Sequence, residues 1–491
     1  MGNSLSQYAR DRMYLCKKDG ATDLNLSSCE IKKLPRAILK FKKTLTKLNV
    51  GKNFLTEFNS QIEKFLLLQT LIADSNELTE TIPTLSKLEH LIHLDISNNL
   101  LTNVPNHLKH LQHLNISINS INSFPRELDL PALQELFYAH NKVSIFPTEI
   151  LELRNLRTLD LAGNRLNYLP DEISSLAATL QALDLSENQF TSFPPPITTL
   201  TALRSLRLAG NQLGQLTSVF TNLSNLEVID FSECQLTSFD FDLSKLVALT
   251  DLSLARNRIS ELSSQTAISL GQLKLMRFLD LSKGTFNSIP KQVGWLSNLR
   301  RLNVSENQIT KLPGELSLLN PSIDMILIPN PLEYPSCEWI KDGIPLFLQH
   351  IKPYMRAYGP NSNVYNLEKT MYAMAPNQFN IRAMDFEGKP RISGMDKFEV
   401  RMLLDGASSP SLDAPTRASH HSSTFFRTID CIVKDNKSTE PGTYTVFFNS
   451  PQTGSYVLYI TTDDLPIKDS PFFVELVSKP QAQLPNEQQQ E

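Results

Sequence analysis

A phrase of the form LxxLxLxxNxLxxLP recurs through the first two thirds of the chain, from Leu45 to Leu332, and its copies usually begin 23 residues apart. The clearest copy reads LRTLDLAGNRLNYLP, from Leu156 to Pro170. A unit of this size cannot bury an apolar core alone, so each copy must stack on its neighbours. The repeat therefore predicts a solenoid before any single residue is interpreted.

Within each copy, alternating residues indicate a short strand. Leu159 and Leu161 are expected to point inward, and Asp160 between them is expected to point outward. The proline that follows the second leucine, as at Pro170, predicts an extended outer side without long helices.

The asparagine of the phrase falls three residues after the last strand leucine, where the backbone turns inward. A buried turn leaves amides and carbonyls that need partners, and an asparagine side chain offers both donors and an acceptor. Cys29 and Cys234 take the same place in two copies and are expected to be small, buried, structural substitutes. The asparagines at this place are Asn53, Asn76, Asn99, Asn119, Asn141, Asn164, Asn188, Asn211, Asn257 and Asn307.

The phrase resembles that of the leucine-rich repeat family, and its form ending in Leu-Pro is similar to the cytoplasmic subclass that includes Ras-pathway scaffolds. This resemblance implies an α/β leucine-rich repeat solenoid, or horseshoe, of about 13 to 14 repeats over residues 20–335. It also implies a protein-binding platform, although the fold serves many unrelated partners.

After the repeats, the apolar run from Ile344 to Met355 predicts a terminal cap helix within residues 336–357, because the last coil would otherwise expose an apolar cross-section. From about Arg356 the periodicity changes to two, as in Phe379-Ile381-Ala383, and turns separate several such runs. This pattern predicts an all-β antiparallel sandwich over residues 358–478. Residues 479–491 are polar and are expected to be a disordered tail.

The segments GTYTVFF, TGSYVLYI and IKDSPFFVEL resemble a filamin-type immunoglobulin-like repeat. The resemblance implies that a partner β-strand can add to an edge strand at about Lys397 to Leu404. Glu399, Arg401 and Leu403 would point outward there and tune specificity. Alternatively, the Ser-, Pro- and His-rich loop at residues 405–424 covers this edge, and the module only packs or dimerises.

On the solenoid, the outward strand residues line the concave face and are free of the packing constraint. Phe137 stands where most other copies have an acidic or amide residue and one has Arg207, and an aromatic among charges is typical of a protein-binding hot spot. Arginines among the aspartates give a mixed-sign surface, which favours a charged protein partner over nucleic acid. The predicted concave binding residues are Phe137, Asp160, Asp184, Arg204, Arg207, Asp230, Arg256, Arg277, Phe278 and Asp280.

Histidines cluster in one part of the array. His93, His113 and Glu135 occupy equivalent outward positions on three successive strands. A flat ladder of three ligands fits tetrahedral zinc poorly and lacks a fourth ligand, so a polar binding face is the preferred interpretation and no metal is predicted.

The chain begins with MGNSLS, which fits the pattern for removal of Met1 and myristoylation of Gly2. Residues 1–50 contain eleven Lys or Arg and four Asp or Glu, a net charge of +7 in a chain whose total is −4. An acyl chain together with basic residues can anchor a protein to an anionic leaflet. Residues 1–19 are expected to be a flexible basic segment. The alternative is that these lysines only solvate the end of the solenoid.

The five cysteines are scattered without paired spacing, and no apolar run is long enough to span a bilayer. These features favour a reducing, cytoplasmic location, here at the inner face of the plasma membrane. The sequence contains no GxxxxGK[ST], HExxH, CxxC or nucleophile-elbow motif. We therefore expect a protein that is not an enzyme and uses no cofactor.

Together these patterns predict a membrane-tethered signalling adaptor whose horseshoe holds one protein, by analogy a small GTPase, and whose sandwich holds another. One alternative is a cytoskeletal linker that works through the filamin-like module. Another is a regulatory subunit of a phosphatase or kinase.

Overall fold

The computed structural model describes residues 6–58, 60–80, 83–333, 340–341, 343–352, 361–385, 388–391, 396–404, 428–429, 431–436, 440, 442–462 and 465–478. The chain divides into two compact units. The first comprises Met1–Leu312 and Leu318–Leu348, and the second comprises Pro313–Ser317 and Gln349–Glu491. In the described part of the chain, no helix is both long and apolar enough to cross a bilayer.

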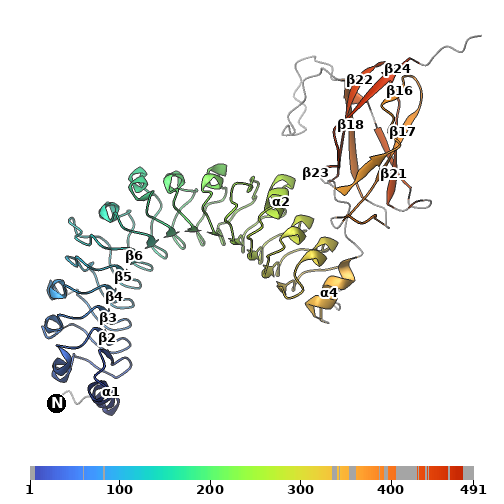
Figure 1. Ribbon diagram of the computed structural model, residues 1–491. Helices are drawn as coiled ribbons and strands as arrows, with labels where there is room; N and C mark the ends of the chain where they lie inside the picture. Colours follow the sequence, from blue (N-terminus) through green and yellow to red (C-terminus); the bar gives the residue numbers. More distant parts are fainter. Residues whose placement is uncertain are drawn as a thin grey trace, which may run out of the picture. The chain divides into compact units, whose positions relative to one another are not determined.

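The first unit is a solenoid built on a parallel sheet of fourteen strands, in which each strand pairs with the next one along the chain. The strands line the inner side of the curve in Figure 1, and most helices lie on its outer side. The strands are β1 (Asp23–Asn25), β2 (Lys47–Asn49), β3 (Thr70–Ile72), β4 (His93–Asp95), β5 (His113–Asn115), β6 (Glu135–Phe137), β7 (Thr158–Asp160), β8 (Ala182–Asp184), β9 (Ser205–Arg207), β10 (Val228–Asp230), β11 (Asp251–Ser253), β12 (Phe278–Asp280), β13 (Arg301–Asn303) and β14 (Asp324–Ile326).

The central leucines of neighbouring strands align, as Leu136, Leu159 and Leu183 do across β6 to β8. All three are at most 1% exposed, and the flanking Asp160 is half-buried on the concave face. The predicted inward and outward alternation is therefore confirmed. Each buried leucine stabilises the stack by about 1.5–3 kcal/mol once its neighbouring coil is in place.

The outer side carries short 3₁₀ helices rather than long α-helices. Several begin directly after a proline in an extended conformation, as η5 does after Pro170. Proline fixes φ at this position and has no backbone N–H. The 3₁₀ helix therefore begins directly after it. The helices are η1 (Arg36–Phe41), η2 (Ile62–Lys64), η3 (Pro83–Lys87), η4 (Thr148–Glu152), η5 (Asp171–Leu176), η6 (Pro195–Thr199), η7 (Ser218–Asn222), η8 (Lys291–Trp295) and η9 (Gly314–Leu318).

The longest interval between copies, from Leu249 to Met276, adds the α-helix α2 (Ser264–Gly271). The Ser263 hydroxyl accepts a hydrogen bond from the Thr266 amide and caps its start. At its end, a Cβ added to Gly271 would lie 2.8 Å from the Trp295 ring of η8. The extra residues thus form an outer helix packed closely on its neighbour.

The helix α1 (Gln7–Lys18) begins the first unit, so the prediction of a flexible segment over residues 1–19 is wrong for the described part. The Ser6 hydroxyl accepts from the Ala9 amide at 3.2 Å and donates to the Cys29 carbonyl at 3.0 Å, which ties the helix to the first coil. Ala9, Met13 and Cys16 are buried against that coil. Their spacing of four and three residues was the signal of an amphipathic helix.

The other end carries α4 (Ile344–Ile351), which is shorter than the cap helix expected over residues 336–357. Phe347 and Leu348, which belong to the first unit, are at most 3% exposed, as residues that cover an apolar cross-section must be. Residues 336–339, 342 and 353–357 lie outside the described residues.

The second unit is a sandwich of a four-stranded sheet, β15-β17-β21-β20, and a six-stranded sheet, β16-β24-β22-β18-β19 with β23 beside β22. Its strands pair antiparallel, as predicted, except that β16 pairs with β24 in parallel. Phe379, Ile381 and Ala383 are fully buried, which confirms the period of two. The strands are β15 (Asn363–Tyr365), β16 (Thr370–Tyr372), β17 (Asn377–Arg382), β18 (Phe398–Leu404), β19 (Thr428–Ile429), β20 (Cys431–Asp435), β21 (Thr443–Phe448), β22 (Gly454–Thr462), β23 (Leu465–Pro466) and β24 (Phe472–Val477).

Candidate protein-binding surface

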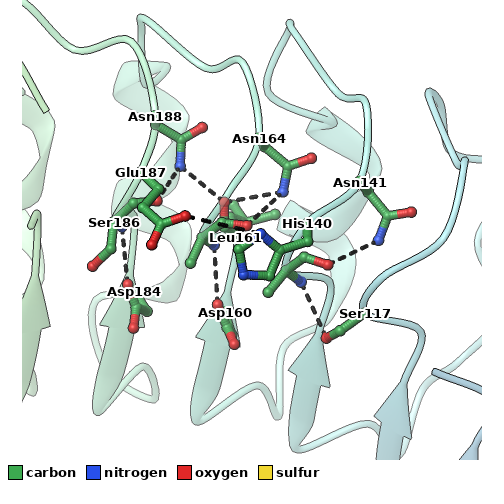
Figure 2. A network of polar contacts seen from close by, with 12 residues as sticks. Ser117, His140, Asn141, Asp160, Leu161, Asn164, Asp184, Ser186, Glu187 and Asn188 are labelled. Atoms are coloured by element: carbon green, nitrogen blue, oxygen red, sulfur yellow. Dashed lines mark hydrogen bonds and ion pairs between the residues drawn. The ribbon is translucent and has the colours of Figure 1, made fainter. Parts of the chain in front are cut away.

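Buried asparagines hold the coils behind the concave face in register. Asn164 donates to the carbonyls of Leu161 at 3.0 Å and Tyr138 at 3.1 Å, and its carbonyl accepts from the Val143 amide at 3.2 Å. Figure 2 shows Asn141, Asn164 and Asn188 in equivalent places on three coils. The same ladder ends at Asn330, which sequence reasoning missed because the last copy is degenerate.

Cys234 confirms the predicted role of the thiols in this ladder. Its Sγ lies 3.2 Å from the Leu208 carbonyl, the bond that asparagine makes in other coils. Burial raises the pKa of the thiol to about 12. Cys234 is therefore a protonated structural donor at neutral pH.

The acidic residues at the outward end of the strands have a structural role. Asp160 accepts from the Ala162 amide at 3.0 Å and Asp184 from the Ser186 amide at 2.9 Å, which caps the turn after each strand (Figure 2). Burial raises the pKa of Asp160 above its usual value, and the neighbouring Asp184 adds to this rise. The same side-chain bond is made by Asn49, Asp95, Asn115, Asp230, Asp280 and Asn303.

Between β4 and β13, three strands end in a residue other than Asp or Asn: Phe137, Arg207 and Ser253. Phenylalanine and arginine side chains have no acceptor that could cap the turn. Phe137 is half-buried, whereas Arg207 is exposed. Arg207 aligns with Asp184 and Asp230 on either side, yet it forms no ion pair with any residue that the structure describes. Arg207 is thus an exposed charge without a structural requirement.

Arg207 borders a shallow depression of about 290 Å³ on the concave face of β9 to β13. Phe278, which is 43% exposed, contributes an aromatic side chain to it. Three carboxylates and two guanidinium groups give the depression both signs of charge. Its lining is Arg207, Val228, Ile229, Asp230, Asp251, Leu252, Ser253, Phe278, Leu279, Asp280, Arg301 and Asn303.

The depression brings together only four of the ten predicted concave residues: Arg207, Asp230, Phe278 and Asp280. It also contains Asp251, which sequence reasoning missed, and Arg301, which belongs to the arginines of the mixed-sign surface but was not among the predicted binding residues. Both align with Phe278 in the first outward column, so the signal lay in comparing that column across strands. Arg301 also contacts Asp324 at 3.4 Å.

The other six predicted concave residues lie outside the depression. Arg204 and Arg256 are held by ion pairs of 2.6 Å with Glu227 and Glu233, and Arg277 is exposed just before β12. The remaining three stand on β6, β7 and β8 and are Phe137, Asp160 and Asp184.

The histidine segment forms a polar patch on β4 to β6. The rings of His93 and His113 lie 5.7 Å apart, and His113 Nδ1 lies 2.8 Å from Glu135 Oε2. Burial lowers the pKa of His93, and the neighbouring His113 lowers it further. Among the described residues there is no group of three or more His, Cys, Asp or Glu side chains placed to hold a metal ion.

On the sandwich, the prediction that β18 is an open edge is wrong for part of its length. β18 pairs with β22 along one side, and Met402 and Leu403 pair with β19 on the other. β20, which contains Val433, does not lie beside β18. It belongs to the opposite sheet, because the chain changes sheets between Ile429 and Cys431. The stretch from Phe398 to Arg401, and Leu404 at the end of the strand, lack a second backbone partner among the described residues.

The predicted side chains of β18 differ in exposure. Glu399 and Arg401 are exposed and contact each other at 3.4 Å, and Leu403 is half-buried. The loop at residues 405–424, expected as a possible cover for this edge, lies outside the described residues.

Comparisons with known proteins agree with both units. Residues 128–269 match the family described as Leucine-rich repeat region, and residues 298–319 match Leucine Rich Repeat. Residues 354–473 match Filamin/ABP280 repeat. The leucine-rich repeat family and fold are typically non-enzymatic protein-binding modules, and no enzyme family is indicated.

Among curated proteins, a leucine-rich repeat and calponin homology domain-containing protein of Drosophila melanogaster is 30% identical over 178 residues, 32% of this chain and 20% of that protein. A protein flightless-1 homolog of Caenorhabditis elegans is 27% identical over 126 residues, 25% of this chain. The chain spans 20% and 8% of the lengths of these two relatives.

Among solved structures, a leucine-rich repeat protein of Leptospira interrogans is 30% identical with a TM-score of 0.57. The match covers 67% of this chain and 83% of that one. The repeat phrase, the parallel sheet with its asparagine ladder, and these matches agree. The chain therefore belongs to the leucine-rich repeat family and carries a filamin-type repeat after its solenoid.

Proposed function

We propose that the chain is a non-enzymatic adaptor that binds a partner protein in the depression on β9 to β13. The observation that carries this proposal is the pairing of an exposed aromatic, Phe278, with an exposed cation, Arg207, that caps no turn and forms no ion pair in the described structure. Aromatic and arginine side chains contribute most to protein-binding hot spots. The mixed charge around them favours a partner segment with its own basic and acidic residues beside an apolar anchor.

The test is affinity capture with the full chain, compared between Phe278→Ala, Arg207→Glu and the control Phe54→Ala. Phe54 is 46% exposed, close to the value for Phe278, and lies at the other end of the solenoid. We expect a specific partner to be retained by wild type and Phe54→Ala and lost by at least tenfold in the other two variants. Equal capture by all four proteins would contradict the site.

The identity of the partner can be tested in the same experiment. The resemblance to Ras-pathway scaffolds makes a small GTPase the first candidate. Capture that depends on the bound nucleotide supports this candidate, and capture that ignores the nucleotide counts against it.

A membrane tether at the cytoplasmic face of the plasma membrane is the second part of this proposal. Gly2 lies outside the described residues, so the support is the MGNSLS motif and the net charge of +7 in residues 1–50. Tethering would raise the effective concentration of the bound partner at the membrane. The test is the intact mass and membrane fraction of wild type and Gly2→Ala from eukaryotic cells. An unmodified Gly2 with both proteins soluble would refute the tether.

A cytoskeletal linker is the second candidate function, supported by the Filamin/ABP280 repeat and by the calponin homology domain in the name of the Drosophila relative. A partner strand would add beside β18 from Phe398 to Arg401, with Glu399 and Arg401 tuning specificity. Co-sedimentation of the full chain with actin networks tests this candidate. Arg401→Pro should abolish co-sedimentation because proline disrupts backbone pairing in this stretch. Since Arg401 also pairs with Tyr459 of β22, an unchanged unfolding midpoint of the sandwich is the control.

A further inference from the structure

A basic cavity of about 730 Å³ lies where the start of α1 meets the first coils. Its size is within the range of about 300–1,000 Å³ that is usual for small-ligand sites. Four cationic side chains and one carboxylate line it, so the lining carries a net charge of +3. The lining is Ser6, Arg10, Cys29, Glu30, Ile31, Lys32, Lys33, Leu34, Pro35, Arg36, Ala37, Ser60 and Gln61.

The cationic groups converge from separate elements. Arg10 comes from α1, Lys32 and Lys33 from the turn after β1, and Arg36 from the start of η1. Lys33 contacts Glu57 at 3.4 Å, an exposed pair that contributes little. Lys32 and Arg36 are exposed and form no ion pair with the described residues. Their charges are therefore available to a ligand.

The wall of the cavity is fixed by local contacts. Ser6 is engaged in capping α1 and in its bond to the Cys29 carbonyl, so its hydroxyl is not counted among the donors for a ligand. Ile31 and Leu34 are buried beneath the charges. A fixed wall with exposed cationic side chains above it fits a compact, highly charged anion better than an extended acyl chain, which would need a continuous apolar lining.

One exposed aromatic side chain of α1 lies beside the cavity. Tyr14 is 66% exposed, whereas Tyr8 and Leu15 are exposed on another side of the helix, where the Arg12 guanidinium lies 4.5 Å from the centre of the Tyr8 ring. Tyr14 follows Arg10 by one helical turn and therefore lies on the same side of the helix as the cavity. Tyrosines with basic neighbours are the side chains that favour the headgroup level of a bilayer.

We propose that this cavity binds the phosphorylated headgroup of an anionic membrane lipid, a polyphosphoinositide, through Arg10, Lys32, Lys33 and Arg36. Arginine and lysine bind phosphate oxygens by charge-assisted hydrogen bonds, and basic pockets at a membrane surface recognise such headgroups. The site deepens the membrane tether proposed above, because it adds lipid selectivity to an anchor otherwise based on an acyl chain and diffuse charge.

The test measures binding of the full chain carrying Gly2→Ala, so that no acyl chain contributes, to three kinds of vesicle. These contain phosphatidylcholine alone, phosphatidylcholine with phosphatidylserine, or phosphatidylcholine with phosphatidylinositol 4,5-bisphosphate at matched surface charge. We expect about tenfold tighter binding to the phosphoinositide vesicles than to the phosphatidylserine vesicles. Soluble inositol 1,4,5-trisphosphate should compete with the phosphoinositide vesicles.

The matched variants separate a site from diffuse attraction. Lys32→Ala with Arg36→Ala removes two cavity charges, and Lys42→Ala with Lys43→Ala removes two exposed charges outside the lining. The cavity pair should reduce the tenfold preference to about one, and the control pair should weaken binding to both anionic vesicles while preserving the preference. All four residues are exposed, so both proteins should unfold at the wild-type urea midpoint.

Equal binding of the Gly2→Ala protein to both anionic vesicles, or an equal loss of preference in the two double variants, would overturn the headgroup site. This result is distinct from failure of the tether. Headgroup preference in vitro with an unmodified Gly2 in cells would refute the acyl anchor and leave the site in place. An acylated Gly2 without headgroup preference would do the reverse.

Discussion

At the scale of single residues, several outward aspartates of the concave face combine exposure to solvent with a fixed role in the fold. Each carboxylate caps the turn that follows its strand, as Asp184 does at the Ser186 amide. Asparagine performs the same role at Asn115 and Asn303. Aspartate at this position is therefore weak evidence for partner binding. A residue that stands at this position and cannot cap the turn, above all Arg207, is stronger evidence.

The first prediction concerns this cap. Asp184→Ala should lower the free energy of unfolding by about 1 kcal/mol because the Ser186 amide loses its acceptor. Asp184→Asn should keep or slightly raise the free energy of unfolding, since an amide oxygen accepts the same bond and the repulsion with Asp160 is removed. Urea unfolding of both variants is the measurement, and an equal loss in the two would show that charge rather than capping matters.

The second prediction concerns the pH dependence of stability through Asp160. Its pKa is raised in the folded protein, mainly by burial, so the ionised carboxylate disfavours folding. The protonated form of Asp160 favours the folded state. This stabilisation is fully present below the pKa that Asp160 has in the unfolded chain, and it is lost as the pH rises through the higher pKa that Asp160 has in the folded protein. Asp160→Asn keeps the cap without the charge. The variant should be more stable than wild type at neutral pH, with the difference shrinking in acid, as measured by urea unfolding across pH.

The third prediction concerns the asparagine ladder. Asn164→Ala would leave the Val143 amide unpaired in a buried turn, and it would remove one of the two side-chain donors to each of the Leu161 and Tyr138 carbonyls, which keep Asn188 and Asn141. An unpaired buried group costs about 1–3 kcal/mol and each lost bond adds to this, so we expect a loss of about 3 kcal/mol. Asn164→Cys should cost less, because Cys234 makes the corresponding carbonyl contact natively. Urea unfolding measures both, and equal losses would deny the thiol a structural role.

At the scale of elements, packing between neighbouring outer helices is the clearest constraint. Gly271 at the end of α2 faces Trp295 and Gln292 of η8, and an added Cβ would lie within 3.0 Å of atoms of both residues. Gly271→Ala should therefore lower the free energy of unfolding by about 1–3 kcal/mol, because one backbone must move. Ser264→Ala, at the first residue of the same helix, is the control. Unchanged stability of Gly271→Ala would mean that α2 shifts freely.

At the scale of the whole molecule, each unit has its own core. Among the described residues, the buried core of the sandwich runs from Met371 to Leu476, and Val364 and Leu367 pack against it. Phe379→Ala should therefore lower the unfolding midpoint of the sandwich and leave that of the solenoid unchanged, and Leu206→Ala should do the reverse. Calorimetry of the full chain is the measurement. One transition shifted equally by both variants would show that the units unfold together.

The sequence alone determined the solenoid, the inward leucines, the asparagine ladder and the sandwich. These features depend on local periodicity, because every copy of the phrase meets nearly the same neighbours and must satisfy the same buried turn. The period of two in the sandwich is local in the same sense.

The tertiary structure alone decided which surface residues act together. Phe278, Asp251 and Arg301 lie together because stacking aligns equivalent positions on successive coils. Part of β18 pairs with β19 as well as with β22, because β19 forms in the same sheet before the chain crosses to the other sheet. The docking of α1, which creates the basic cavity, depends on the burial of Ala9, Met13 and Cys16 and on a bond from Ser6 to a carbonyl in the first coil. Such contacts join residues about 20 or more positions apart, and their formation depends on register and curvature, which a repeating local pattern does not encode.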